Sequence, residues 1–207
     1  MNGTVNGASS DVIGRVLRAS TRGFSCGTHS TRIGDHHDFG AFVRAPVAND
    51  PDQWVIGLIS AVEIKDDLMI SELVMAEWVN PNVLRDQREN RMIPVEVGVL
   101  NIGYHMSNGE FVHSFPPRPP MSLSEVTLCP PEEVCAFTNR LDFFRLVLQA
   151  SEVPSEDLLA MALRYALACR VPDERQAFRV AAGRQLARLL TGDLRRLAHI
   201  LALLSGN

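Results

Sequence analysis

The stretch WVIGLISAVEIKDD, from Trp54 to Asp67, combines an apolar run with an abrupt acidic end. Its β-branched residues and central Gly57 are typical of a strand in a curved sheet, where a glycine marks a bulge or bend. Glu63, Asp66 and Asp67 follow where such a strand would turn through solvent. Carboxylates could instead hold a divalent metal, but a metal site needs oxygen ligands that converge from several segments. We therefore favour an exposed turn.

Three further segments have the composition or alternation of strands. VIGRVLR begins at Val12 and FGAFVRAPV begins at Phe39, and each is bounded by turn-forming residues. In IPVEVGVLNI, from Ile93 to Ile102, apolar residues alternate with polar or small ones. Successive side chains of a strand point to opposite faces, so one face of this strand is expected to be buried.

Turn residues and glycines indicate how these strands are arranged. Asn108 and Gly109 suit a tight hairpin turn just before Phe111. The glycines inside the predicted strands are expected at bulges that curl a short sheet closed: Gly14, Gly57 and Gly98. These features predict a small closed antiparallel β-barrel. Residues 1–10 are expected to be a disordered leader, and the charged stretch from Glu72 to Arg91 an exposed loop.

The composition is that of an ordinary globular protein. The 207 residues are 46% hydrophobic, which suffices for one sizeable core or two small ones without disulfides or metal. The four cysteines form no C-x-x-C pair, and no apolar segment resembling a secretory signal opens the chain. No run reaches the roughly 18 to 20 apolar residues of a membrane-spanning helix. We therefore expect a soluble protein in a reducing cytoplasm.

Charge is distributed unevenly along the chain. The net charge is −4, but the part up to Ala136 holds 10 basic and 17 acidic residues, and the part after it holds 10 basic and 7 acidic residues. This change from −7 to +3 indicates two modules. Lys65 is the only lysine. The sequence therefore lacks a polybasic tract of the kind that binds phosphate backbones.

The apolar period changes to that of helices after the proline-rich segment. A first helix is predicted by four residues that recur three or four positions apart: Phe137, Leu141, Phe144 and Leu148. Ser155, followed by two acids, predicts the N-cap of a second helix. That helix is apolar nearly all round, so we expect it at the centre of a bundle or in an oligomer contact.

Two more helices complete the predicted bundle. Pro172 is expected to begin a third helix that ends near Gly192, and Asp193 to Leu204 a fourth. The predicted fold class is therefore α+β: a small closed antiparallel β-barrel over residues 11–134, followed by about four short helices in a helical domain over residues 135–207.

The order of the strand segments resembles a known family, the HAS barrel, named after the HerA DNA translocase and ATP synthase. The resemblance rests on IGRVLRAS, RIGDHHDFGAFVRAP, WVIGLISAVEI and the proline-rich SFPPRPPMSLSEVTLCPPEEV, and it covers about Asp11 to Val134. It includes a pair of acids, Glu132 and Glu133, after the prolines. Members of the family have closed barrels that form a crown in hexameric ATPases and dock partners such as the NurA nuclease. The resemblance therefore implies scaffolding rather than catalysis.

The chain departs from the translocases of this family in one respect. Their barrel is followed by an ATPase domain with a phosphate-binding loop, whereas this sequence contains no G-x-x-x-x-G-K-[ST] motif. Lys65 has no glycine loop before it and no Ser or Thr after it. We therefore expect no ATP hydrolysis by a P-loop mechanism, no enzymatic activity and no cofactor.

One cluster has the residue types of a metal site: His36, His37 and Asp38, with Cys26 and His29 nearby. Adjacent histidines on an extended chain point to opposite sides, and no paired motif completes a tetrahedron. We favour a solvated loop. A metal-dependent enzyme that uses Asp66, Asp67 or His36 remains the weakest of three functional hypotheses.

The arginines of the third helix suggest a place for contacts. Arg184 and Arg188 lie opposite its apolar face and are most simply solvated. Arg175 and Arg179 fall nearer the apolar side, where a guanidinium needs a carboxylate, so they are candidates for a partner interface. Our leading hypothesis is a non-enzymatic module that forms a homo-oligomer or docks on a separately encoded ATPase or nuclease. The HAS-like barrel is expected to supply the docking surface, and the helices are expected to supply oligomer or partner contacts. The alternative is a DNA-processing accessory protein that binds nucleic acid through its C-terminal arginines.

Overall fold

The computed structural model describes residues 11–65, Met75 and residues 93–205. The expected leader over residues 1–10 lies outside this part of the chain, as does the expected loop from Glu72 to Arg91 apart from Met75. No helix in the described ranges is both long and apolar enough to cross a membrane.

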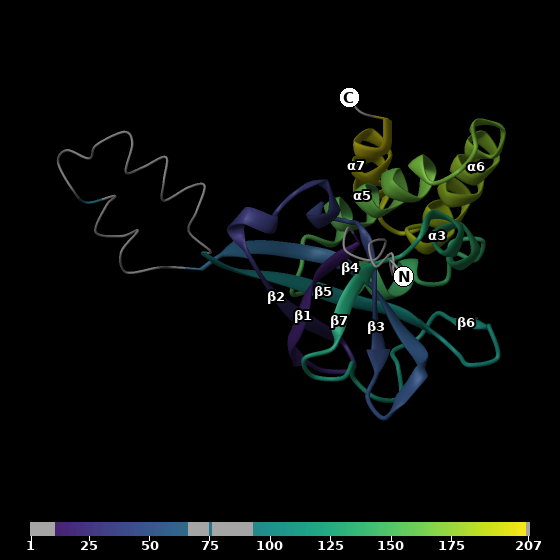
Figure 1. The fold of residues 1–207 in the computed structure, drawn as a ribbon. Helices are drawn as coiled ribbons and strands as arrows, with labels where there is room; N and C mark the ends of the chain where they lie inside the picture. The colour runs from purple at the N-terminus through teal and green to yellow at the C-terminus, as the bar shows by residue number, and fades with distance from the viewer. Residues whose placement is uncertain (1–10, 66–74, 76–92, 206–207) are drawn as a thin grey trace.

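The strands of the described chain belong to one antiparallel sheet (Figure 1). They are β1 (Val12–Ala19), β2 (Gly23–His29), β3 (Phe42–Val47), β4 (Asp50–Ile64), β5 (Pro94–His105), β6 (Phe111–Val112) and β7 (Glu125–Leu128). Their order is β2-β1-β7-β3-β4-β5-β6, and an additional pairing of β2 with β5 closes six of them into a ring. The predicted closed antiparallel barrel is confirmed. The short β6 lies outside the ring and pairs with β5.

The predicted bulges and hairpin are present. Register shifts occur next to Gly14 on β1, next to Gly57 on β4, and where Ala61 pairs with Gly98. A side chain at Gly14 would collide with the backbone carbonyl of Gly27 on the neighbouring strand, so the tight crossing requires glycine. The hairpin between β5 and β6 turns at Gly109, whose φ is +88°.

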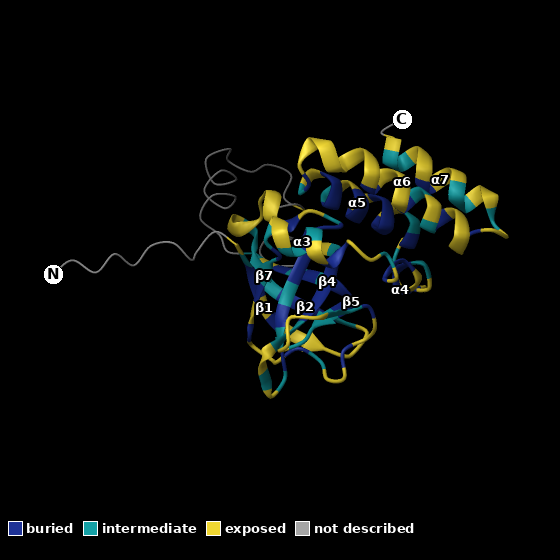
Figure 2. Ribbon diagram, turned by 90° about the vertical axis from the view of Figure 1, so that its right-hand side faces the viewer, coloured by how far each residue is buried: buried dark blue, intermediate teal, exposed yellow. Residues whose placement is uncertain are grey.

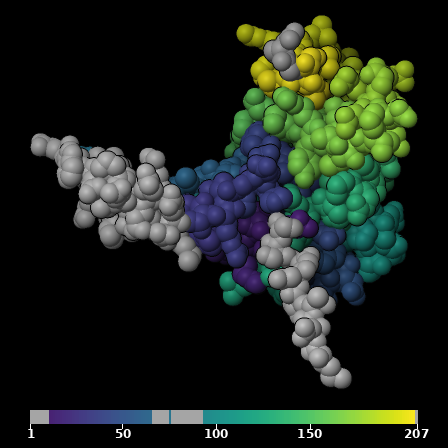
Figure 3. Space-filling view, turned by 45° about the horizontal axis from the view of Figure 1, so that its top comes forward, coloured from purple at the N-terminus to yellow at the C-terminus, as the bar shows by residue number. Residues whose placement is uncertain are grey.

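Alternation along the strands produces two hydrophobic cores. Inside the barrel, Val95, Val97 and Val99 of β5 pack with residues of the other strands, as the sequence pattern predicted. On the outer face of the same wall, other strand residues pack against the helices: Phe42 of β3, Ile56 and Leu58 of β4, and Leu100 and Ile102 of β5. The helices therefore cover one wall of the barrel from outside (Figures 1 and 3).

The helical layer consists of α3 (Pro131–Phe137), α4 (Phe144–Leu148), α5 (Ser155–Ala168), α6 (Pro172–Leu189) and α7 (Leu194–Ser205). Two short 3-10 helices, Ser30–Arg32 and Asp35–His37, precede β3. Figure 2 shows α5 as largely buried, whereas α6 has long exposed stretches. The expected central position of α5 is confirmed, because its residues belong to the core shared by barrel and helices.

The expected first helix is divided. Phe137 and Phe144 are buried as their spacing predicted, but they lie on two short helices, α3 and α4. The break follows Thr138, whose hydroxyl donates to the carbonyl of Val134 at 2.6 Å beside its own backbone amide at 3.0 Å, a side-chain bond that tends to bend helices. The layer therefore contains five described helices rather than about four.

Helix ends also differ in detail from the sequence pattern. Ser155 is the first residue of α5 rather than its N-cap, and its hydroxyl contacts Glu156 instead of a backbone amide. Pro172 begins α6 as expected, while Gly192 lies in the turn after α6. Asp193 caps α7, because its carboxylate accepts a hydrogen bond from the amide of Arg196 at 3.1 Å.

Candidate interaction surfaces

The histidine cluster does not assemble into an ion site. His37 is buried, and its Nε2 lies 3.1 Å from the carbonyl oxygen of Ile13, whereas His36 and Asp38 are exposed. Cys26 lies in the barrel core, where burial raises the pKa of its thiol to about 12. Across residues 11–65 and 93–205 no group of three or more His, Cys, Asp or Glu side chains is arranged to hold a metal ion.

The acids that end the opening strand segment are only partly described. Glu63 is exposed at the end of β4 and pairs with Lys65 at 2.7 Å. Lys65 also contacts Glu96 of β5 at 3.2 Å, and Arg18 of β1 pairs with the same carboxylate. These contacts hold the ends of three strands together on the outer face of the barrel. Asp66 and Asp67 lie outside the described residues, so the predicted exposed turn is seen only up to Lys65.

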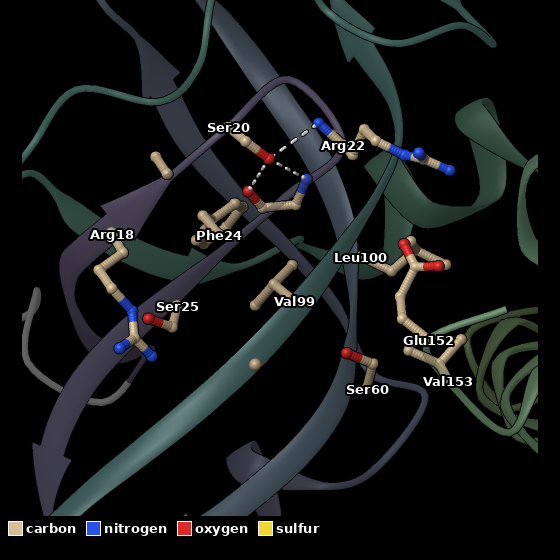
Figure 4. Close-up of a pocket in the computed structure, with 13 residues that line it drawn as sticks. Arg18, Ser20, Arg22, Phe24, Ser25, Ser60, Val99, Leu100, Glu152 and Val153 are labelled. Atoms are coloured by element: carbon tan, nitrogen blue, oxygen red, sulfur yellow. Dashed lines mark hydrogen bonds between the residues drawn. The ribbon is translucent and has the colours of Figure 1, made fainter. Parts of the chain in front are cut away.

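A groove of about 580 Å³ runs along the outer face of β2 and β5 towards the helices (Figure 4). Its lining includes Arg18, Arg22, Ser25, Ser60 and Glu152. No histidine or cysteine is among the described residues that line it, and Glu152 supplies its one carboxylate. The hydroxyl of Ser25 lies near the carboxylate of Glu96, which also pairs with Arg18. Guanidinium groups and hydroxyls of this lining are donors that could bind a polar ligand.

The turn at one end of the groove is held by a residue that sequence reasoning missed. Asn101 is fully buried, and its amide nitrogen donates to the carbonyls of Ser20 and Thr21, at 3.3 and 3.0 Å. Its backbone amide donates to the carbonyl of Arg22 at 2.9 Å. The sequence did contain an indication of this role. The alternation along β5 places Asn101 on the same inward face as Val99, where a polar side chain needs hydrogen-bond partners.

Arg170 is a second residue that sequence reasoning missed. It is 4% exposed, its guanidinium lies 3.6 Å from the ring centroid of Phe178, and it donates to Thr138 Oγ1 and the Ala166 carbonyl, at 2.7 and 2.8 Å. Burial lowers the pKa of this guanidinium. Arg170 thereby joins α3, α5 and α6. Its sequence position between two helices carries no sign of these contacts, which arise only when the helices pack.

The two proposed interface arginines lie in different surroundings. The Nε of Arg175 donates to the carbonyl of Arg170 at 2.9 Å, so this guanidinium caps the end of α5 rather than pairing with a carboxylate. Arg179 is exposed on α6. Arg184 and Arg188 are exposed on the other side of α6, as predicted. They line a hollow of about 350 Å³ together with Arg140, which the sequence spacing did not associate with them.

The fold and these surfaces define a class of protein: a closed antiparallel β-barrel covered on one wall by a helical layer. Comparisons of the chain with models of protein families and with curated proteins found no match.

Proposed function

We propose that this chain is a non-enzymatic interaction module, which assembles with itself or docks on a separately encoded ATPase or nuclease. The resemblance of residues 11–134 to HAS barrels supports the class of partner, because barrels of that family scaffold ATPases and dock a nuclease. The closed six-stranded ring is the architecture that the resemblance implies. The sequence led us to expect the docking surface on the barrel; because so little of α6 is buried, we instead assign the contacts to the helical layer.

The observation that carries this proposal is the small number of side chains that α6 buries. A helix on the surface of a globular protein buries three to four side chains per two turns, so five turns would bury about eight. The 18 residues of α6 bury only Phe178, Ala182 and Leu186. Most of α6 therefore contributes little to the fold and is accessible to a partner.

Exposed apolar side chains on α6 and α7 support a protein as the partner. Val180 and Leu189 of α6 and Leu201 of α7 are each 40% exposed, and Leu194 at the start of α7 is 71% exposed. Burial of apolar area and of arginine stems is typical of protein interfaces.

Native mass and partner retention test the proposal. We expect the purified chain to have a native mass of two or more times 22.8 kDa, or to bind an ATPase or nuclease stably. A strictly monomeric chain that retains neither class of partner would contradict the proposal, as would turnover of a substrate by the chain alone.

The alternative, a DNA-processing accessory protein, makes a different prediction. It expects salt-dependent binding of labelled DNA that is lost when the exposed arginines of α6 and α7 are reversed in charge. Three of the C-terminal arginines are engaged within the chain, since Arg196 pairs with Glu156, Arg175 donates to a backbone carbonyl and Arg170 is buried. The described surface of α6 also has no exposed aromatic ring on which a base could stack. We therefore place the protein partner first.

A further inference from the structure

Three guanidinium groups surround a hollow between α6 and the turn that joins α3 to α4. The hollow has a volume of about 350 Å³, and its polar lining comprises Asn139, Arg140, Asp142, Arg184, Gln185 and Arg188. Arg184 and Arg188 are one turn apart on α6, so their side chains lie on the same face. Arg140 comes from the facing turn. We refer to this feature as the arginine hollow.

Positive charge in the arginine hollow exceeds the negative charge available to neutralise it. Among the described residues that line it, Asp142 is the one carboxylate, and it accepts hydrogen bonds from Nε and Nη2 of Arg140 at 3.2 and 2.9 Å. Within the same part of the chain, the guanidinium of Arg188 donates only to the neutral amide of Gln185, at 3.3 Å. Arg184 makes no hydrogen bond or ion pair with the described residues. Two guanidinium groups therefore face the hollow without a carboxylate partner.

The packing of the fold does not require this arrangement. Like charges four residues apart on one helix destabilise it, and the acids of α6, Asp173 and Glu174, lie in its first turn. Arg184 is about 15 Å further along the helix axis. The two arginines are thus neither paired within the helix nor required for its packing, because the buried side chains of α6 are Phe178, Ala182 and Leu186.

A second hollow shares two lining residues with the first. Arg140 and Asp142 also line a hollow of about 450 Å³ that reaches β6 and includes Arg145 and Phe111. Nη2 of Arg145 donates to the carbonyl of His113 at 3.0 Å, which fixes its direction. The two hollows thus lie on either side of Arg140 and Asp142, and basic side chains line both of them.

We propose that the arginine hollow binds an acidic segment of a partner protein, with Arg184 and Arg188 pairing its carboxylates. Guanidinium forks bind carboxylates with two parallel hydrogen bonds. The half-buried Leu141 and the small Ala181 in the same lining provide apolar contact for a peptide chain. No aromatic ring is among the described residues of the arginine hollow itself, and in the neighbouring hollow Phe111 packs against His105 and Phe137 and His113 is buried. Neither hollow therefore offers a free ring face for a nucleobase among the described residues. This inference rests on the proposed function, since it names the chemistry of the partner.

The test is direct binding of a fluorescein-labelled oligoglutamate peptide to the full-length chain at low ionic strength, measured by fluorescence anisotropy. The variant Arg184→Glu/Arg188→Glu should weaken binding roughly tenfold or more, as expected for the loss of charge-assisted hydrogen bonds. Arg164→Glu/Arg195→Glu is the matched control, because it changes net charge equally at exposed arginines of α5 and α7. The neutral variant Arg184→Gln/Arg188→Gln should also bind weakly, and circular dichroism verifies that each variant is folded.

Three outcomes would overturn the inference: no saturable binding of oligoglutamate, equal losses in the control and in Arg184→Glu/Arg188→Glu, or stronger binding of an oligodeoxynucleotide with the same number of charges. The last outcome would instead support the DNA-processing alternative. Retention of an ATPase or nuclease is measured separately. A variant that no longer binds oligoglutamate but still retains such a partner would refute the role of the arginine hollow in partner binding. It would leave the proposed function standing.

Discussion

Arg44 of β3 and Glu133 of α3 form an ion pair of 2.8 Å across the junction between the barrel and the helices. The guanidinium of Arg44 also lies 4.9 Å from the ring centroid of Trp54. The Glu133 side chain is only 10% exposed, and burial raises the pKa of its carboxyl although Arg44 opposes the increase. Glu133, the second of the two acids that follow the prolines, therefore has a structural role, because it ties α3 to the barrel.

Replacing Arg44 should destabilise the protein in a pH-dependent way. Arg44→Ala leaves Glu133 partly buried without a partner, so we expect a loss of about 2–3 kcal/mol in the free energy of unfolding at pH 7. Protonation of Glu133 relieves the unpaired charge, so the loss should be smaller near pH 4. Urea denaturation at the two pH values measures both. The double variant Arg44→Ala/Glu133→Gln should be less destabilised than Arg44→Ala alone, and equal losses would show that the ion pair is unimportant.

His113 should make the stability sensitive to mild acid. It is 5% exposed, its Nε2 lies 3.1 Å from the carbonyl oxygen of Phe137, and burial lowers its pKa below the ordinary 6.5. The unfolded chain therefore binds a proton at a higher pH than the folded chain, and stability should decrease as pH falls through 6.5. This decrease should be reduced in His113→Gln and retained in His199→Gln, which changes an exposed residue of α7. Identical pH profiles for the wild type and His113→Gln would contradict the prediction.

Arg170 should be required for the packing of the helical layer. Arg170→Ala removes hydrogen bonds to Thr138 and Ala166 and the contact with Phe178, and we expect a loss of about 2–4 kcal/mol. Arg170→Lys should not restore the stability, because an ammonium lacks the planar fork. The exposed Arg164→Ala on α5 is the control, with an expected change within about 0.5 kcal/mol. Similar unfolding midpoints for all three variants would refute this role.

Gly40 should control how closely α5 approaches the barrel. Its φ is +86°, and an added Cβ would lie 2.7 Å from Met161 Cβ and 2.8 Å from the amide nitrogen of Ala162. Gly40→Ala therefore combines backbone strain with collision, and a loss of about 2–4 kcal/mol is expected. Gly34→Ala, in the same connection, has nothing within 4 Å and should change stability little. Thermal unfolding compares the two, and equal effects would exclude a close approach at Gly40.

Local patterns in the sequence predicted the barrel, because alternation along β5, the Asn108–Gly109 turn and the glycine bulges are each determined by neighbouring residues. The strand β2 was missed, since GFSCGTH has small and polar residues that are buried only when the ring closes. Spacing likewise predicted that Arg184 and Arg188 share a face. Spacing could not place Arg140 beside them, because that proximity depends on the break between α3 and α4 and on how α6 packs.

The central claim is that the helical layer docks this chain on another protein. The most direct measurement is quantitative mass spectrometry of proteins retained from native lysate by the full chain, by Val180→Glu on the exposed side of α6, and by Leu17→Glu on β1 of the barrel. The account predicts an ATPase or nuclease that is retained by the wild type and by Leu17→Glu but lost with Val180→Glu. Retention of the same proteins by all three would contradict it, as would a wild type that retains no ATPase or nuclease and is also monomeric.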